Sequence, residues 1–276
     1  MPILVLNQSQ RRKLKDLYFQ AEALGRQHDL ARREIMTALR CLKAVHSNAI
    51  EERSIDRVFL QILLHDAGIK ERSAISPQYE YAYRVLKGQQ AMFQNLEARA
   101  AAKEPLSISL LLEMHRQVFG RAWKQGAGEF RTSDVSIAQV RHQPPPAQNV
   151  QTLLHQRFVG INEALDTIGE VTRESFGRIL QLAAQAHYLV AAVHPFEDGN
   201  GRMARAIGDY VFLRFGMYYD VIMTDYRSEY LDSLEESSLT DCTPLYDFLE
   251  YSYLETLERI STFFRLTQMD DNSVVA

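Results

Sequence analysis

Twelve consecutive residues concentrate the side chains of this chain that are best suited to a phosphorylated substrate: His194-Pro195-Phe196-Glu197-Asp198-Gly199-Asn200-Gly201-Arg202-Met203-Ala204-Arg205. Gly199 and Gly201 let backbone N–H groups approach a ligand without an intervening Cβ. At the start of a helix, such N–H groups point toward an anion. Arg202 and Arg205 are three residues apart, so both can project from one helix face toward that anion.

Two further residues of this stretch could take part in chemistry on the anion. Asp198 is a hard oxygen ligand, suited to a Mg²⁺ ion that also binds phosphate oxygens. His194 can act as a general base near neutral pH. Taken singly, a helix-end histidine, a tight glycine loop and surface arginines are each more often structural. Their concentration in one short stretch favours phosphoryl or nucleotidyl transfer.

Helical periodicity dominates the rest of the chain, and one compact, mainly α domain is expected. Caps and apolar spacing predict helices over 9–25, from Asp29 through Val45, over 55–68, 77–102, 107–119, from Val150, and over 176–192, 201–215 and 244–264. Glycines, alternating residues and a proline cluster in 126–146 predict a short β-hairpin flap. We divide the chain into N-terminal helices (1–75), a core (76–265) and a disordered tail (266–276).

Composition excludes several classes of protein. The net charge of −4 argues against bulk electrostatic binding to nucleic acid. Cys41 and Cys242 form no metal or redox pair, which indicates a reducing compartment. No stretch is long and apolar enough to span a membrane, and no secretion signal is evident. A cytoplasmic location follows by default, although an effector injected by a secretion system would look the same.

The segment 194–205 resembles the signature of the Fic family, His-x-Phe-x-Asp/Glu-Gly-Asn-Gly-Arg-x-x-Arg, at every specified position. Leu112 to Phe119 with His115, then Gly128-Glu129-Phe130-Arg131-Thr132 and the proline cluster, are similar to the family's helix and flap. By pattern, the resemblance covers about residues 30 to 260. It implies a compact helical Fic-type domain with a short β-hairpin flap.

The resemblance implies a protein adenylyltransferase that moves AMP from ATP to a Ser, Thr or Tyr hydroxyl of a target protein, with Mg²⁺ as cofactor. His194 would deprotonate the hydroxyl, which attacks the α-phosphate, and Asp198 would hold the metal. Phe196 would anchor the loop in the core. The phosphates would be bound by Gly199, Asn200, Gly201, Arg202 and Arg205. Relatives with other transfer activities typically carry Ala-Asn where this chain has Gly199-Asn200.

Two further regions have implied roles with open alternatives. Val135, Ser136 and Ile137 in the flap would hold the target's backbone by strand pairing, or they form an ordinary edge strand. Tyr230 stands where relatives place an aromatic residue against adenine, and plain packing is an equal alternative. The partners expected are ATP and a protein target, and the chain itself is one candidate target. A homodimer is also a candidate state.

Ser47 and Glu51 fit the family's inhibitory pattern Ser/Thr-x-x-x-Glu-Gly/Asn, except that Glu52 occupies the last position. Glu51 would form a bidentate ion pair with Arg205 and so take an arginine that the γ-phosphate needs. The resemblance then implies an N-terminal inhibitory helix. Alternatives are a solvated Glu51, an enzyme that removes AMP from modified proteins, and a nucleotide-binding regulatory module with little turnover. A DNA-binding regulator is poorly supported because the chain is acidic.

Overall fold

A computed structural model of the chain describes residues 4–51, 77–137 and 142–273. The predicted mainly helical fold is confirmed in these residues. The helices are α1 (Gln8–Gln27), α2 (Asp29–Glu51), α4 (Pro77–Ala101), α5 (Ile108–Phe119), α6 (Val150–Asp166), α7 (Ser175–Val193), α8 (Asn200–Arg214), α9 (Arg227–Glu236) and α10 (Thr243–Ser273), with 3₁₀ turns at Ala147–Asn149 and Thr224–Tyr226.

Side-chain caps explain where two helices begin. The Asn7 side chain accepts from the Gln10 backbone N–H at 3.0 Å, and the Gln10 side chain accepts from the Asn7 N–H at 2.9 Å, which makes a capping box for α1. The Ser107 hydroxyl accepts from the Leu110 N–H at 3.1 Å and caps α5. Both helices therefore begin within a residue of the predicted positions.

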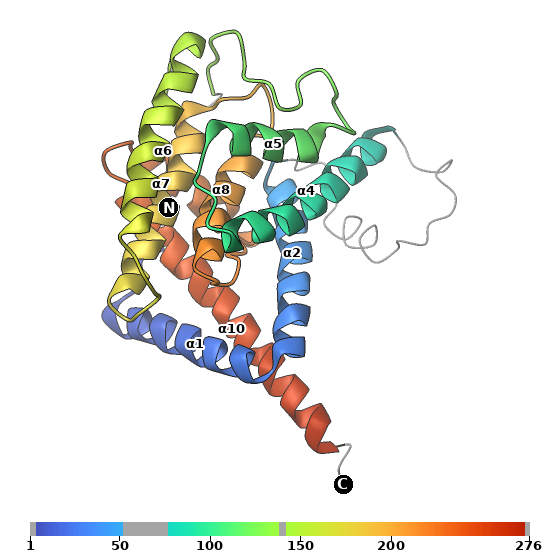
Figure 1. Cartoon of the computed structure of the whole chain (residues 1–276), viewed down its shortest axis with the longest axis vertical. Helices are drawn as coiled ribbons and strands as arrows, with labels where there is room; N and C mark the ends of the chain where they lie inside the picture. The colour runs from blue at the N-terminus through green and yellow to red at the C-terminus, as the bar shows by residue number, and fades with distance from the viewer. Residues whose placement is uncertain (1–3, 52–76, 138–141, 274–276) are drawn as a thin grey trace.

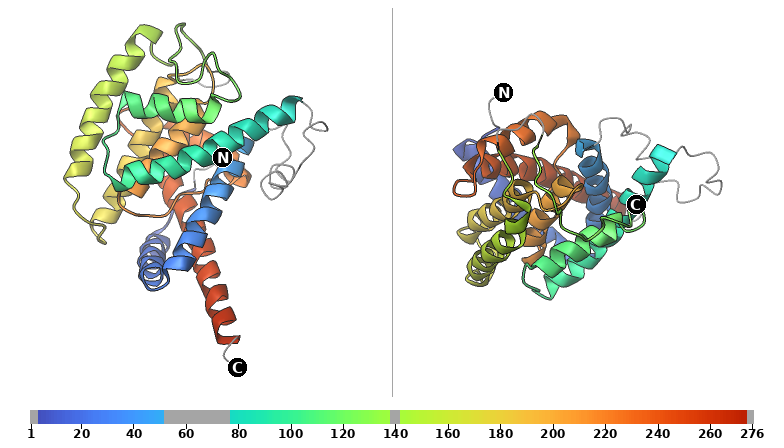
Figure 2. Two further views of the ribbon diagram at one scale, coloured as in Figure 1. Left: turned by 45° about the vertical axis from the view of Figure 1, so that its right-hand side comes forward. Right: turned by 90° about the horizontal axis from the view of Figure 1, so that it is seen from above.

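Helices α7 and α8 form the centre of the molecule (Figure 1) and pack extensively against each other. Because α7 is apolar on nearly all sides, it can be buried all round. Helices α6 and α10 pack against α7, and α4 and α2 pack against α8, as the additional views in Figure 2 show. Helix α1 lies along α10. The first turn of α8, which carries the paired arginines, is thus surrounded by the ends of other helices.

Several predicted boundaries differ from the structure. Helix α9 was not predicted, because only Tyr230 and Ser233 of its ten residues are buried and its apolar periodicity is weak. Helix α10 continues to Ser273, so residues 266–273 of the tail expected to be disordered are helical; no Gly or Pro follows Pro244 to end the helix.

Two other expectations fall partly or wholly on residues outside the described ranges. The described flap residues form no strand, and 138–141 lie outside the described residues, so the β-hairpin is not confirmed. The helix predicted over 55–68 and the boundary between 75 and 76 also lie outside the described part of the chain.

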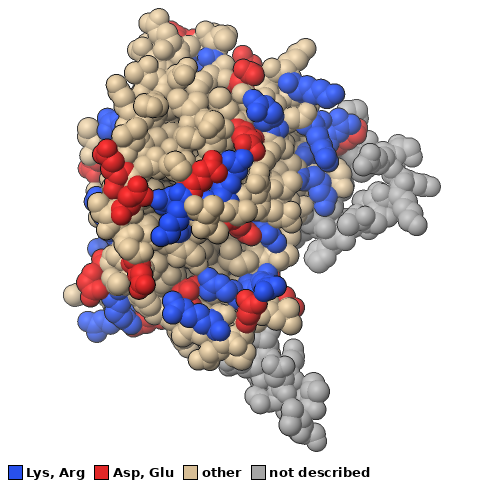
Figure 3. All heavy atoms as spheres, in the orientation of Figure 1, with Lys and Arg blue, Asp and Glu red and all other residues tan. Residues whose placement is uncertain are grey.

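Charged side chains of both signs are interspersed over the face drawn in Figure 3, and no large area of a single sign appears on it. This agrees with the small net charge of −4. Within the described ranges, no helix has the length and apolar character needed to cross a membrane. Cys41 and Cys242 are both free thiols, as their spacing predicted.

Candidate active site

The loop between α7 and α8 is bounded by two residues in the left-handed backbone region. His194 ends α7 with φ 50° and ψ 58°, and Gly199 precedes α8 with φ 85° and ψ 6°. A non-glycine residue persists in this region only when its surroundings hold it there. The conformation of His194 is therefore imposed by its contacts.

Arg131 supplies those contacts. Its Nε donates to the His194 carbonyl at 2.8 Å, and its own N–H donates to the Pro195 carbonyl at 2.9 Å. Its Nη1 donates to the Ser133 carbonyl at 2.9 Å, and its Nη2 donates to the Pro145 carbonyl. Arg131 thus joins the loop between α7 and α8 (194–199, the catalytic loop) to Ser133 and Pro145 of the flap. This role of Arg131 was not predicted from the sequence, although the residue lies in a stretch that resembles the family's flap.

Phe196 anchors the loop in the core, as predicted. Its ring is fully buried and stacks on His115 with the centroids 3.8 Å apart. His115 Nε2 donates to the Asp198 carbonyl at 3.0 Å, and its Nδ1 accepts from the Gly128 N–H at 2.8 Å. These partners require the neutral ring, and burial lowers the pKa of His115 to about 4. His115 therefore sets the position of Asp198.

Asn200 closes the same loop on itself. Its Oδ1 accepts from the Phe196 N–H, and its Nδ2 donates to the Phe196 carbonyl, both at 2.8 Å. The side chain is buried. These bonds give Asn200 a positioning role in the structure, while its predicted contact with phosphate stays a prediction.

His194 has the protonation state that a general base needs. Burial lowers the pKa of its imidazole below the ordinary value of 6.5, and nearby Arg131 acts in the same direction. A hydrogen bond to the backbone of Ala191 opposes the shift but does not cancel it. The ring is consequently neutral near pH 7 and able to accept a proton.

Asp198 is oriented at the mouth of the loop. Its Oδ1 accepts from the Gly199 N–H at 2.6 Å and from Arg202 Nη2 at 2.9 Å, and its Oδ2 accepts from the Tyr81 hydroxyl at 3.3 Å. The side chain is 52% exposed. A half-exposed carboxylate beside an anion site fits Mg²⁺, which is commonly bound through one or two carboxylates together with phosphates and water.

Arg202 lies in the first turn of α8 and is buried. Its guanidinium lies over the Phe119 ring, 4.6 Å from the centroid, which favours a cation there. Besides its bond to Asp198, Arg202 donates from Nη1 to the side-chain oxygen Oδ1 of Asn48 at 3.4 Å. The first N–H groups of a helix have no intrahelical partner, so the first turn of α8 combines a cation with free donors.

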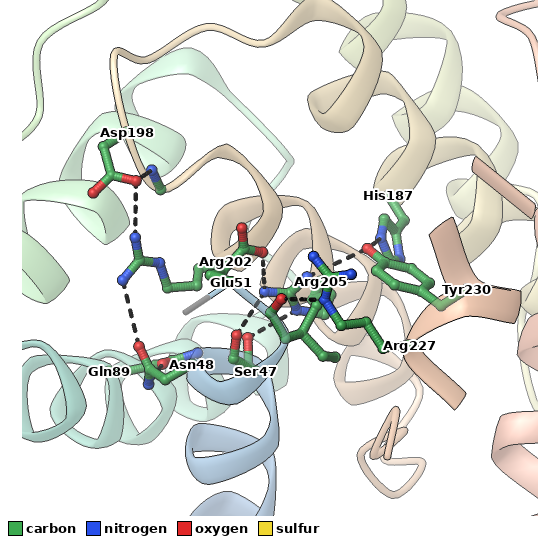
Figure 4. Close-up of polar contacts among 12 residues, drawn as sticks. Ser47, Asn48, Glu51, Gln89, His187, Asp198, Arg202, Arg205, Arg227 and Tyr230 are labelled. Atoms are coloured by element: carbon green, nitrogen blue, oxygen red, sulfur yellow. Dashed lines mark hydrogen bonds and ion pairs between the residues drawn. The ribbon is translucent and has the colours of Figure 1, made fainter. Parts of the chain in front are cut away.

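Arg205, also buried, is held by the end of α2 (Figure 4). Its Nη2 donates to Glu51 Oε1 at 2.6 Å and to the Ser47 carbonyl at 2.8 Å, and its Nε donates to the Ser47 hydroxyl at 2.8 Å. The predicted Glu51–Arg205 contact is therefore present. Its bidentate geometry was wrong, because Ser47 takes the Nε side of the guanidinium.

The Glu51 carboxylate occupies space above the start of α8. A Cβ added at Gly201 would lie 2.1 Å from Glu51 Oε1, so the carboxylate contacts the backbone at the predicted anion site. Burial acts to raise the pKa of Glu51, but Arg205 and Arg202 outweigh it and the pKa lies below its usual value. Glu51 is thus a carboxylate beside Gly201 and Arg205, at the predicted phosphate site.

Comparison with known proteins agrees with this geometry. The sequence model of the Fic/DOC family matches residues 105–212, which include the catalytic loop and both arginines. The chain carries a Fic/DOC domain. Protein adenylyltransferase fic-1 of Caenorhabditis elegans is 31% identical to it over 221 residues, covering 79% of this chain and 40% of the relative. Protein adenylyltransferase Fic of Drosophila melanogaster is 27% identical over 234 residues, covering 79% and 45%.

Solved Fic structures share the fold. A Fic domain-containing signaling protein from Bacteroides thetaiotaomicron superposes with a TM-score of 0.77 at 21% identity, over 92% of this chain and 97% of that one. Fic-1 of C. elegans superposes with a TM-score of 0.73 at 26% identity, over 95% and 73%. The chain spans less than half the length of the curated relatives named above.

Tyr230 of this Fic domain is buried, with 1% of its surface exposed. Its hydroxyl lies 2.8 Å from His187 Nε2 and 3.4 Å from Arg205 Nη1, and its ring packs against Phe248. The structure therefore gives Tyr230 a packing role beside Arg205, which was the alternative to an adenine contact. In this arrangement its ring has no open face for a nucleotide.

Three residues in the described part of the flap were predicted to hold the target. Val135, Ser136 and Ile137 have irregular backbone, and Ser136 is exposed. Their role in target binding stays a prediction.

Proposed function

We propose that this chain transfers AMP from ATP to a Ser, Thr or Tyr hydroxyl of a protein target, and that Glu51 inhibits the transfer. The names of the relatives support the reaction. The contact between Glu51 and Arg205, at 2.6 Å, supports the inhibition. It is the one observation that carries the proposal, because it places a carboxylate on a phosphate-binding arginine.

The chemistry follows from the placement of the side chains. The neutral His194 takes the proton of the target hydroxyl, and the hydroxyl oxygen forms a bond to the α-phosphorus. The bond between the α-phosphorus and the oxygen that bridges to the β-phosphate breaks, so pyrophosphate leaves. Arg202, Arg205 and the N–H groups of α8 balance the charge of the β- and γ-phosphates. Mg²⁺, held through Asp198, would supply further neutralisation of phosphate charge.

Inhibition follows from competition for Arg205. While Glu51 and Ser47 occupy its donors, the γ-phosphate lacks its partner, and ATP binds in a pose unsuited to in-line attack. A hydrogen bond between charged groups contributes about 1.5–3 kcal/mol. Glu51→Gly is therefore expected to raise labelling of the chain or a target by labelled ATP about tenfold or more.

The same change on the solvent-facing side of α2, Glu34→Gly, is the matched control, because Glu34 is exposed. It is expected to leave labelling unchanged. In the Glu51→Gly background, His194→Ala should lower labelling at least about 100-fold. Unchanged labelling in Glu51→Gly contradicts the inhibition, and persistent labelling without His194 contradicts the role of the base.

Removal of AMP from modified proteins is the second candidate. It is favoured by Glu51, which is ionised, lies at the phosphate site and keeps 34% of its side chain exposed to water. Such a carboxylate could orient a water molecule. Incubation of an AMP-modified target with the wild-type chain and with Glu51→Gly distinguishes the activities, since only removal requires Glu51.

A further inference from the structure

A buried ion pair joins α2 to α8 two helical turns before Glu51. Lys43 Nζ lies 2.7 Å from Asp209 Oδ2, and their side chains are 3% and 1% exposed. Lys43 Nζ also donates to the Asp220 carbonyl at 2.5 Å, and Asp209 Oδ1 accepts from the Asp220 N–H at 3.2 Å. Neither the catalytic loop nor the predicted phosphate contacts use this pair.

The spacing links the ion pair to the contact at Arg205. Lys43, Ser47 and Glu51 are four residues apart and share one face of α2. Arg205 and Asp209 are four residues apart on α8. One face of α2 therefore packs against one face of α8. On these two faces, Lys43 contacts Asp209, and Ser47 and Glu51 contact Arg205.

The energetics of such a pair favour a role in register. Taking two charges out of water costs several kcal/mol each, so a buried pair adds little net stability. Removing the partner of a buried charge is strongly destabilising, because it leaves an uncompensated charge in the core. If α2 slid by one turn along α8, Lys43 and Asp209 would both lose their partner inside the protein, because one turn moves a residue by about 5.4 Å. The pair thus disfavours a one-turn slip from the observed register.

We propose that Lys43 and Asp209 are positioning residues that fix the register of α2 on α8 and so deliver Ser47 and Glu51 to Arg205. The inference rests on the proposed inhibition by Glu51. The strength of the inhibition then depends on a contact that is remote from the phosphate site and buried between α2 and α8.

The test replaces the pair with uncharged residues in the full chain. Lys43→Met keeps the length of the lysine stem, and Asp209→Asn keeps the oxygen that accepts from the Asp220 N–H. The double variant should raise labelling by labelled ATP at least about threefold over wild type, within the range of coupling energies for contacting residues. In the Glu51→Gly background it should add nothing, because both changes act through the same contact.

Hydrogen exchange supplies a readout that does not depend on activity. Amides of α2 near Ser47 should exchange faster in the double variant than in wild type. The matched control is Arg40→Met, which removes an ion pair from α2 to Glu97 of α4 at 3.0 Å, and should change neither labelling nor exchange near Ser47. If the double variant does not fold, Lys43→Gln with Asp209→Asn, which leaves neither buried side chain charged, provides the same comparison.

The outcomes separate the two proposals. If Glu51→Gly raises labelling and the double variant does not, the register role is wrong and the inhibition stands. The register role is also wrong if the double variant raises labelling equally in the presence and absence of Glu51. If Glu51→Gly leaves labelling unchanged, the inhibition is wrong and the register role falls with it.

Discussion

At the scale of single residues, the protonation state of His194 decides when the proposed transfer can begin. Its backbone is held in the left-handed region by Arg131, and burial keeps its ring neutral. A base is effective at pH values above its own pKa. The environment that orients His194 therefore also widens the pH range in which it works.

A pH profile tests this state of His194. The pKa of the imidazole is lowered from 6.5, so the unprotonated form persists to lower pH, and the acid limb of kcat/KM should have its midpoint below 6.5. The charge of Glu51 acts to raise the pKa of His194, so removing Glu51 lowers the midpoint further. The measurement is labelling by the Glu51→Gly variant from about pH 5 to 8. A midpoint at 6.5 or higher would contradict it.

The sequence predicted those site residues whose partners lie nearby in the chain or in a known pattern. The family resemblance implied that Phe196 is buried and that Glu51 contacts Arg205, and both features are present. Arg131 and Lys43 were missed because their partners lie far away in the chain, and only the fold brings them together. The same holds for the choice of Ser47, rather than Glu51, as partner of Arg205 Nε.

At the scale of elements, Phe196 connects the catalytic loop to the core. Its ring packs between His115 of α5 and Phe130 of the flap. Phe196→Ala should lower the free energy of unfolding by about 3–5 kcal/mol, because it opens a cavity in a closely packed site. Urea unfolding measures the loss. Phe263→Ala, at a half-buried position of α10, is the control and should cost clearly less; equal losses would contradict an anchoring role.

Helices were predicted where apolar periodicity and caps are strong, as in α1 and α5. Periodicity failed for α9, whose short polar sequence is helical because Tyr230 packs against α7 and α10. The end of α10 was missed for the opposite reason, since a polar stretch without a breaker can continue a helix. Tertiary packing and the absence of a stop signal are not visible in local patterns.

At the scale of the whole molecule, two buried neutral histidines join segments that are distant in the chain. His115 links α5 to Gly128 and to the catalytic loop, and His187 links α7 to Tyr230 of α9. Burial lowers the pKa of His115 to about 4 and that of His187 well below 6.5. Between these values and 6.5, the unfolded chain binds more protons than the folded one. Stability therefore rises with pH across this window and is lost as the pH falls.

His115→Gln tests this linkage, because an amide can still donate to the Asp198 carbonyl and accept from Gly128 without titrating. The variant should be less stable than wild type at pH 7, since its fit to Phe196 is poorer. Between pH 7 and pH 5, the free energy of unfolding of the variant should nevertheless fall by about 2 kcal/mol less than that of wild type. This difference is the linkage energy for a pKa lowered from 6.5 to about 4. Urea unfolding at the two pH values measures it, with the exposed His155→Gln as control. If His115→Gln and wild type lose equal stability over this interval, His115 titrates in the folded chain, and its hydrogen bonds do not hold Asp198 through the neutral ring.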